Sequence, residues 1–212
     1  MADILLDEQS TPVTPPSGSG VIYIDSTSSS LRVINDFGTI KELRPPIYNF
    51  STAAQVLSSS TRTYIIGSSI LIPAEKMKIG SCFKWRFNIT KTAAGTATSI
   101  YDVAVGTTGT TADTARLSFT KPVGTAAVDQ GWINIYVICR GPLSASGVLV
   151  GEFILNHNLS ATGHATIPTV VVNTISAAFD VTVANLIVGI CATTGASDAI
   201  TIQLVQAECW NI

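Results

Sequence analysis

The sequence predicts an all-β protein in which an antiparallel, jelly-roll-like β-sandwich follows a small N-terminal β-meander and extended arm. Two observations support this prediction. Segments in which apolar and polar residues alternate with a period of two recur along the chain, whereas no segment sustains helical periodicity over a useful length. Gly, Thr, Ser and Asn separate these segments at intervals of about ten residues, which is typical of sandwiches and barrels.

The chain changes character near residue 44. Acidic side chains and a Pro-rich stretch are concentrated in residues 1–44, whereas Arg140 is the only Lys or Arg after Lys121. We therefore predict three parts, with the prolines that follow Arg44 marking the second because proline cannot donate to a β-ladder. These parts are an arm and meander at 1–44, a linker at 45–61 and a sandwich at 62–212.

The first part contains three short alternating segments, which predict strands at 20–26, 30–35 and 39–43. A Ser/Thr-rich turn joins the first two strands, and the sequence Asn-Asp-Phe-Gly at 35–38 joins the last two, as expected for a meander. Strands this short bury too little apolar surface to be stable alone. We expect them to pack on the sandwich, on symmetry mates or on a larger partner.

The clearest strand of the sandwich is 83–89, where the apolar side chains fall on one face and the polar ones on the other. Segments 132–139 and 181–191 are apolar on both faces, which predicts cover on both sides. Near Leu204–Val205 the alternation changes phase, which predicts a β-bulge. Further strands are expected at 63–72, 99–105, 115–120, 148–156, 169–173, 184–191 and 200–209.

Composition argues against two classes of partner. A net charge of −2, with 12% charged residues, does not fit nucleic-acid binding, which requires clustered Lys and Arg. The same balance does not fit a polybasic membrane anchor, and the longest apolar stretch, at 183–192, falls short of a membrane span. The Ser- and Thr-rich neutral surface that remains is common where chains pack into permanent assemblies.

The two histidines do not predict a catalytic or metal site. His157 or His164 could form a triad on paper with a serine and Asp129 or Asp180, but no nucleophile elbow accompanies them. We interpret His157 as a satisfied edge or interface residue. No third ligand lies at a spacing typical of a metal site, and we expect neither metal nor cofactor.

Carboxylates and cysteines also favour structural interpretations. Asp102, Asp113 and Asp129 could in principle flank a glycosidic bond. However, Asp113 and Asp129 lie in Thr-, Gly- and Ala-rich loops, where Asp is favoured because it bonds its own backbone. The four cysteines are too far apart for a C-x-x-C pair, so we expect buried apolar residues, with a disulfide, within or between chains, as the alternative. We do not expect an enzyme.

Aromatic residues offer two candidates for contact with a subunit or a ligand. Trp85 shares the apolar face of its strand and is expected in the core. Trp210, near the end of the sequence, and Tyr101 are the candidate exposed aromatics.

Two stretches resemble a known class of proteins. Thr-Pro-Val-Thr-Pro-Pro-Ser-Gly-Ser-Gly-Val-Ile-Tyr-Ile-Asp-Ser at 11–26 and Leu-Arg-Val-Ile-Asn-Asp-Phe-Gly-Thr-Ile-Lys-Glu-Leu at 31–43 resemble a small module found near the N-termini of tailed-bacteriophage virion proteins. Ile-Pro-Ala at 72–74, the segment 91–97 and the Thr/Gly-rich segment 106–116 look like the jelly-roll domains of phage decoration and fibre proteins.

The resemblance implies a structural virion protein, either a capsid decoration protein or a head fibre. It implies a homotrimer that docks on the capsid or another virion protein through its N-terminal arm. The alternative is a receptor-binding tail-fibre or tip module that recognises a host surface glycan. The apolar residues of the first part are the candidate docking residues: Ile4, Leu5, Leu6, Val21, Ile22, Tyr23, Ile24, Leu31, Val33, Phe37, Ile40 and Leu43.

Overall fold

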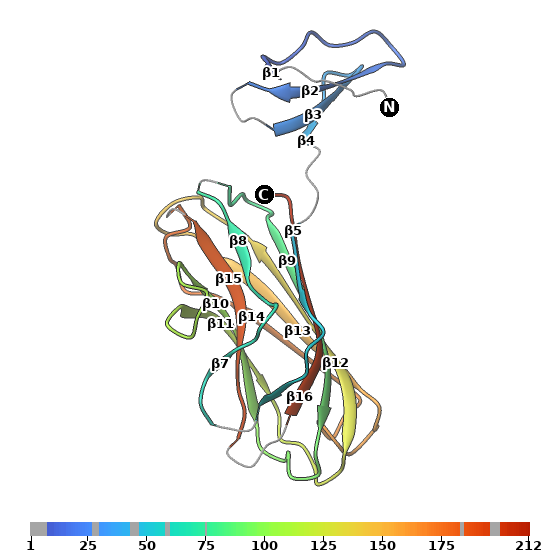
Figure 1. Cartoon of the computed structure of the whole chain (residues 1–212), viewed down its shortest axis with the longest axis vertical. Coiled ribbons are helices and arrows are strands. Elements are labelled where there is room, and N and C mark those ends of the chain that lie inside the picture. Colours follow the sequence, from blue (N-terminus) through green and yellow to red (C-terminus); the bar gives the residue numbers. More distant parts are fainter. Residues whose placement is uncertain are drawn as a thin grey trace. The chain divides into compact units, whose positions relative to one another are not determined.

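The computed structural model is all-β and divides the chain into two units, Met1–Pro45 and Pro46–Ile212 (Figure 1). We call the first unit the foot and the second the head. No helix among the described residues is long and apolar enough to cross a membrane. The predicted fold class, an antiparallel sandwich preceded by a small sheet, is confirmed. The structure describes residues 8–26, 30–42, 47–57, 60–74, 76–182, 185–195 and 200–212.

The described residues form sixteen strands, whose bounds are as follows. They are β1 (Glu8–Gln9), β2 (Gly20–Asp25), β3 (Ser30–Asn35), β4 (Ile40–Glu42), β5 (Ile47–Ser51), β6 (Gln55–Leu57), β7 (Thr63–Tyr64), β8 (Ile70–Ile72), β9 (Cys82–Lys91), β10 (Ser99–Gly106), β11 (Thr114–Lys121), β12 (Asp129–Cys139), β13 (Leu149–His157), β14 (Thr169–Ile175), β15 (Leu186–Thr193) and β16 (Ile200–Trp210).

The foot is a four-stranded sheet in the order β1-β2-β3-β4. Strands β2, β3 and β4 form the predicted antiparallel meander, and β1 adds to β2 in parallel. The predicted turn at 35–38 is held by the Asn35 side chain, whose Oδ1 accepts from the backbone N–H groups of Phe37 and Thr39. A polar side chain that bonds nearby backbone in this way is the usual chemistry of a tight turn.

The head is a sandwich of two antiparallel sheets, which lie face to face in Figure 1. One sheet has the order β11-β10-β15-β7, with β8 also paired to β15. The other has the order β14-β13-β12-β9-β16-β5, with β6 also paired to β16. The predicted bulge is present, because the register of β16 on β9 shifts between Ile202 and Leu204.

Two predictions about segments 45–61 and 63–72 were wrong. The expected linker contains β5 and β6, both of which pair with β16 as part of the head. The single strand expected at 63–72 is two short strands separated by a turn at Gly67, whose φ is 84°. A Cβ at Gly67 would lie 2.6 Å from the backbone of Phe50, so only glycine allows this turn to lie so close to β5.

The core fills the space between the two sheets with large apolar side chains. Trp85 is fully buried, as predicted, and its indole N–H donates to the backbone oxygen of Ser68 over 2.7 Å. The ring of Phe153 lies 5.5 Å from that of Tyr101 and 5.9 Å from that of Phe119, so it joins the two sheets. The prediction that Tyr101 is an exposed aromatic is therefore wrong, because its side chain is fully buried.

The outer face of the seven-stranded sheet is less covered than the sequence predicts. Segment 186–191 in β15 is buried on almost every side chain, as expected, but segment 132–139 in β12 is not. Trp132 and Tyr136 on its outer side are only partly buried, and Ile138 is exposed. Apolar character on both faces of β12 therefore reflects an exposed outer surface and not a fully internal strand.

Candidate functional site

The foot has one buried face and one apolar face that is open. Tyr23 and Ile34 are buried on the first face. On the other, cross-strand pairing places Ile22 beside Val33 and Ile24 beside Leu31. We call these four residues the meander face. They are partly exposed, with Ile22 at 52%.

The remaining candidate docking residues have different environments. Phe37, at the tip of the β3–β4 turn, is 85% exposed, and Ile40 is also exposed, while Val21 is partly buried. Tyr23 is fully buried inside the foot, so its prediction as a docking residue is wrong. Four predicted residues lie outside the described part of the chain: Ile4, Leu5, Leu6 and Leu43.

A second apolar surface crosses the outer face of the seven-stranded sheet. The strand register aligns one residue from each of five neighbouring strands. The exposed members include Trp210 at 40% and Ile175 at 58%. The side chain of Trp210 is therefore accessible, and its contact with a subunit or a ligand stays a prediction. We call this row the head stripe, and its residues are Trp210, Cys82, Ile138, Val150 and Ile175.

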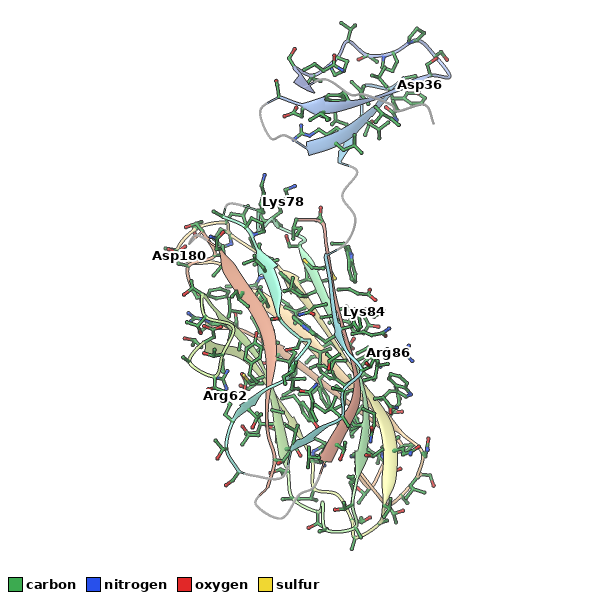
Figure 2. All side chains as sticks on the ribbon, in the orientation of Figure 1. Asp36, Arg62, Lys78, Lys84, Arg86 and Asp180 are labelled. Carbon is green, nitrogen blue, oxygen red and sulfur yellow. The ribbon has the colours of Figure 1, made fainter. Side chains whose placement is uncertain are left out.

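Two cation–aromatic pairs lie beside the head stripe. The Arg86 guanidinium lies 4.1 Å from the centre of the Trp132 ring, and the Lys84 ammonium lies 5.8 Å from that of Tyr136. Lys84 and Arg86 project from the same flank of the head in Figure 2. Each cation covers part of an aromatic face, which leaves less of the ring for stacking against a ligand.

Asp129 is the centre of a buried polar cluster where the ends of β12 and β13 meet. Its Oδ2 accepts from the backbone N–H of His164 and lies 2.7 Å from Nδ1 of His157. Burial would raise the pKa of Asp129, but hydrogen bonds from the backbone N–H groups of His164 and Gln130, and from the His157 ring, hold it below its ordinary value. The interpretation of Asp129 as a turn residue is therefore incomplete, because it also pairs with His157.

The same cluster is closed to a serine nucleophile. Nε2 of His157 lies 2.6 Å from the backbone oxygen of Ile167, so both ring nitrogens already face an oxygen atom. This arrangement confirms the interpretation of His157 as a satisfied residue. Lys91 and Lys121 are buried nearby and donate to backbone oxygens of the surrounding loops.

His164 is the unusual member of this cluster. Its side chain is fully buried, and within the described part of the chain neither ring nitrogen has a hydrogen-bond partner. Burial lowers the pKa of His164 to about 3; the Asp129 charge acts in the opposite sense, and the Lys121 charge adds to the lowering. The ring is therefore neutral at physiological pH.

The loop between β10 and β11 is rigidly held. The side chain of Asp113 accepts from the N–H and hydroxyl of Thr108 and from the N–H of Gly109, which confirms the turn interpretation of Asp113. From outside, Arg62 donates to the backbone oxygens of Thr111 and Asp113 while its Nε lies 2.9 Å from the carboxylate of Asp102. Arg62 therefore links the loop, through its backbone oxygens, to Asp102 of β10.

A cavity of about 330 Å³ lies next to this loop. Its lining includes Arg116 of β11 and, from the segment after β14, Phe179 and Asp180. The Arg116 guanidinium lies 4.5 Å from the centre of the Phe179 ring. Sequence reasoning missed this cavity, because it depends on a bulge in β11 that aligns Leu117 with Val103 and leaves Arg116 without a partner on β10.

The four cysteines are free, and three of them are buried. Burial raises the pKa values of Cys191 and Cys209 to about 12, so both remain protonated thiols at neutral pH. The expectation of buried apolar cysteines is confirmed for these two and for Cys139, whereas Cys82 is partly exposed on the head stripe. Within the described ranges, no three His, Cys, Asp or Glu side chains gather where they could hold a metal ion.

Comparisons with known proteins give distant likenesses only. No protein-family model and no curated protein matches the chain. The CBM2 module of an evolved Dit protein from Lactobacillus casei BL23 phage J-1 is similar with a TM-score of 0.30 and 9% identity, covering 80% of this chain and 99% of that one. A legume lectin-like domain from Entamoeba histolytica has a TM-score of 0.23 and 9% identity, with coverage of 73% and 88%.

A fructofuranosidase from Schwanniomyces occidentalis, complexed with fructose, has a TM-score of 0.24 and 9% identity. The alignment covers 89% of this chain and 39% of the enzyme. None of these likenesses assigns a family or a function to the chain.

Proposed function

We propose that the chain is a structural component of a bacteriophage virion, a capsid decoration or head-fibre protein that docks through its foot. The observation that carries the proposal is the meander face. The foot is a separate unit, yet it leaves Ile22, Ile24, Leu31 and Val33 open on one side of a small sheet. A partner surface is the natural cover for such a face. The resemblance of segments 11–26 and 31–43 to phage virion modules supports a virion protein as that partner.

The energetics favour several linked copies. Burying a whole Ile or Leu side chain stabilises by about 1.5–3 kcal/mol, so four partly exposed ones offer on the order of 4 kcal/mol per foot. Because association itself costs free energy, the dissociation constant for one copy is about 1 mM or weaker. Joining copies makes later contacts intramolecular and tightens attachment by about a hundredfold or more.

The head stripe supports association with further copies of the chain, and the resemblance to phage virion modules implies that the linked form is a homotrimer. Exposed Trp210, Ile138 and Ile175 lie in one row across five strands, a pattern that buries well against another copy.

We propose a non-enzymatic role for the same chain, because His157 has no free ring nitrogen to activate a nucleophile.

Substitution of the meander face in the full chain tests the docking proposal. Ile22→Asp should reduce co-sedimentation with virions assembled without this chain, because a charge would be buried against the partner. Val13→Asp is the matched control, since Val13 is an exposed apolar residue of the foot that lies outside the meander face. Equal binding of both variants at wild-type occupancy would contradict docking through this face.

A second candidate function is recognition of a host glycan by the head. The cavity beside Arg116 favours it, because polar and aromatic side chains converge there in a concave site. A glycan array probed with the full chain tests this function. Binding of a defined set of glycans supports it, and silence on the array together with virion binding leaves only the structural role.

A further inference from the structure

The cavity between the β10–β11 loop and Phe179 has the features of a preformed site. At about 330 Å³ it is at the lower end of the range for small-ligand pockets, about 300–1,000 Å³. One wall is the loop that Arg62 and Asp113 hold by hydrogen bonds in the absence of any ligand. The other wall includes Phe179, whose backbone N–H donates to the oxygen of Gly147 over 3.0 Å.

Arg116 supplies hydrogen-bond donors to this cavity. The bulge in β11 leaves Arg116 unpaired in the register with β10, and Phe179 then supports its guanidinium. Its Nε is buried, and within the described residues it has no hydrogen-bond partner. A ligand in the cavity would therefore meet the terminal nitrogens of the guanidinium and not Nε.

Asp180 supplies the acceptor. Its Oδ1 accepts from the N–H and hydroxyl of Thr182, which fixes the orientation of an exposed carboxylate. Those hydrogen bonds lower the pKa of Asp180, so it is ionised at neutral pH. In the part of the chain that the structure describes, Asp180 and Arg116 form no ion pair with each other, although both line the same cavity.

We propose that this cavity binds one uncharged saccharide unit, with Arg116 donating to its hydroxyl oxygens and Asp180 accepting from its hydroxyl groups. Asp113 also lines the cavity, but its carboxylate oxygens already accept from Thr108 and Gly109. Arg116 and Asp180 are therefore the charged groups open to a ligand, and their opposite charges favour a neutral ligand with both donors and acceptors. The hydroxyls of Thr107 and Thr114 add groups that both donate and accept. The inference rests on the second of the two proposed functions, saccharide binding by the head.

Ligand-observed NMR on the full chain tests the site. The probes are the methyl glycosides of D-glucose, D-galactose, N-acetyl-D-glucosamine and L-rhamnose, with D-glucuronate and D-glucosamine as charged counterparts. We expect at least one neutral glycoside to bind with a dissociation constant of about 1 mM, a value suited to a single sugar in a small cavity.

Three variants locate the binding. Arg116→Gln and Asp180→Asn should each weaken it about tenfold or more, because each removes a charged hydrogen-bond partner. Asp180→Asn keeps an oxygen that can accept from Thr182, so the turn is preserved. Arg86→Gln is the matched control, since Arg86 also lies over an aromatic ring but does not line the cavity.

The results distinguish failure of the cavity as the binding site from failure of saccharide binding by the head. Neutral-sugar binding that neither variant weakens would overturn the cavity and leave saccharide binding in place. Weakening by Arg86→Gln to the same extent would also overturn the cavity. Binding of D-glucuronate or D-glucosamine alone would overturn the assignment of an uncharged ligand. If no probe binds and the glycan array shows no binding either, both the cavity site and the second proposed function are overturned.

Discussion

Replacing His164 should remove a specific part of the acid sensitivity of the head. The ring is buried and neutral, with a pKa lowered to about 3, whereas an unfolded chain gives histidine a value of about 6.5. Below pH 6.5, His164 is therefore protonated in the unfolded state but stays neutral in the folded state. Stability is lost as the pH falls from 6.5 towards 3, and the linkage relation gives a loss of about 2 kcal/mol at pH 5.

Urea unfolding at pH 7.5 and pH 5 measures this loss, with tryptophan fluorescence as the signal because Trp85, Trp132 and Trp210 all lie in the head. For an m value of about 2–3 kcal/mol/M, the midpoint attributable to His164 should fall by about 0.7–1 M. His164→Leu should remove that part of the shift, since the backbone bonds of residue 164 to Asp129 and Lys121 do not need its side chain.

The ionisable neighbours of His164 remain in the variant, so the difference between the two proteins isolates the titration of His164. These neighbours are Asp129, Lys121, His157 and Lys91. At pH 7.5 the variant should be at least as stable as the wild type, because two buried polar atoms without described partners are removed. A variant that loses as much stability as the wild type between pH 7.5 and pH 5 would refute the reasoning.

Three further predictions concern the core, the thiols and the loop. Phe153→Ala should lower the free energy of unfolding by about 3–5 kcal/mol in the same assay, because the ring joins the two sheets; a loss below about 1 kcal/mol would count against that packing. Cys191 and Cys209 should resist an aromatic disulfide reagent at pH 8 until the protein is unfolded, and labelling of either in the native protein would contradict their burial. Arg62→Met should speed amide hydrogen exchange in the loop 106–113, whereas unchanged exchange would mean that Asp113 alone holds it.

The sequence predicts elements well where the signal is local. Alternation located β9, and the phase change near Leu204 located the bulge in β16. The prediction from sequence failed for β5 and β6. Their pairing with β16 joins residues about 150 positions apart, and the nearby prolines indicate a linker. The two-sided apolar pattern of β12 was misleading, because the apolar residues on its outer side are partly exposed and not buried.

The site residues depend on register, which a single sequence does not reveal. The Thr-Ala-Arg-Leu segment at 114–117 reads as regular strand, so nothing in it singles out Arg116; the bulge is visible only against β10. The pairing of Asp129 with His157 follows from the antiparallel register of β12 and β13, which brings the two strand ends together. Tyr101 was misassigned because its exposure depends on which face of β10 meets Phe153.

Co-sedimentation with virions that lack this chain tests the central claim, that the foot attaches the head to a larger particle. The full chain is compared with a head that begins at Pro46, the start of the second unit. We predict that the full chain pellets with the particles, whereas the head remains in the supernatant with an unchanged urea midpoint. Binding of the folded head at the occupancy of the full chain would contradict docking through the foot.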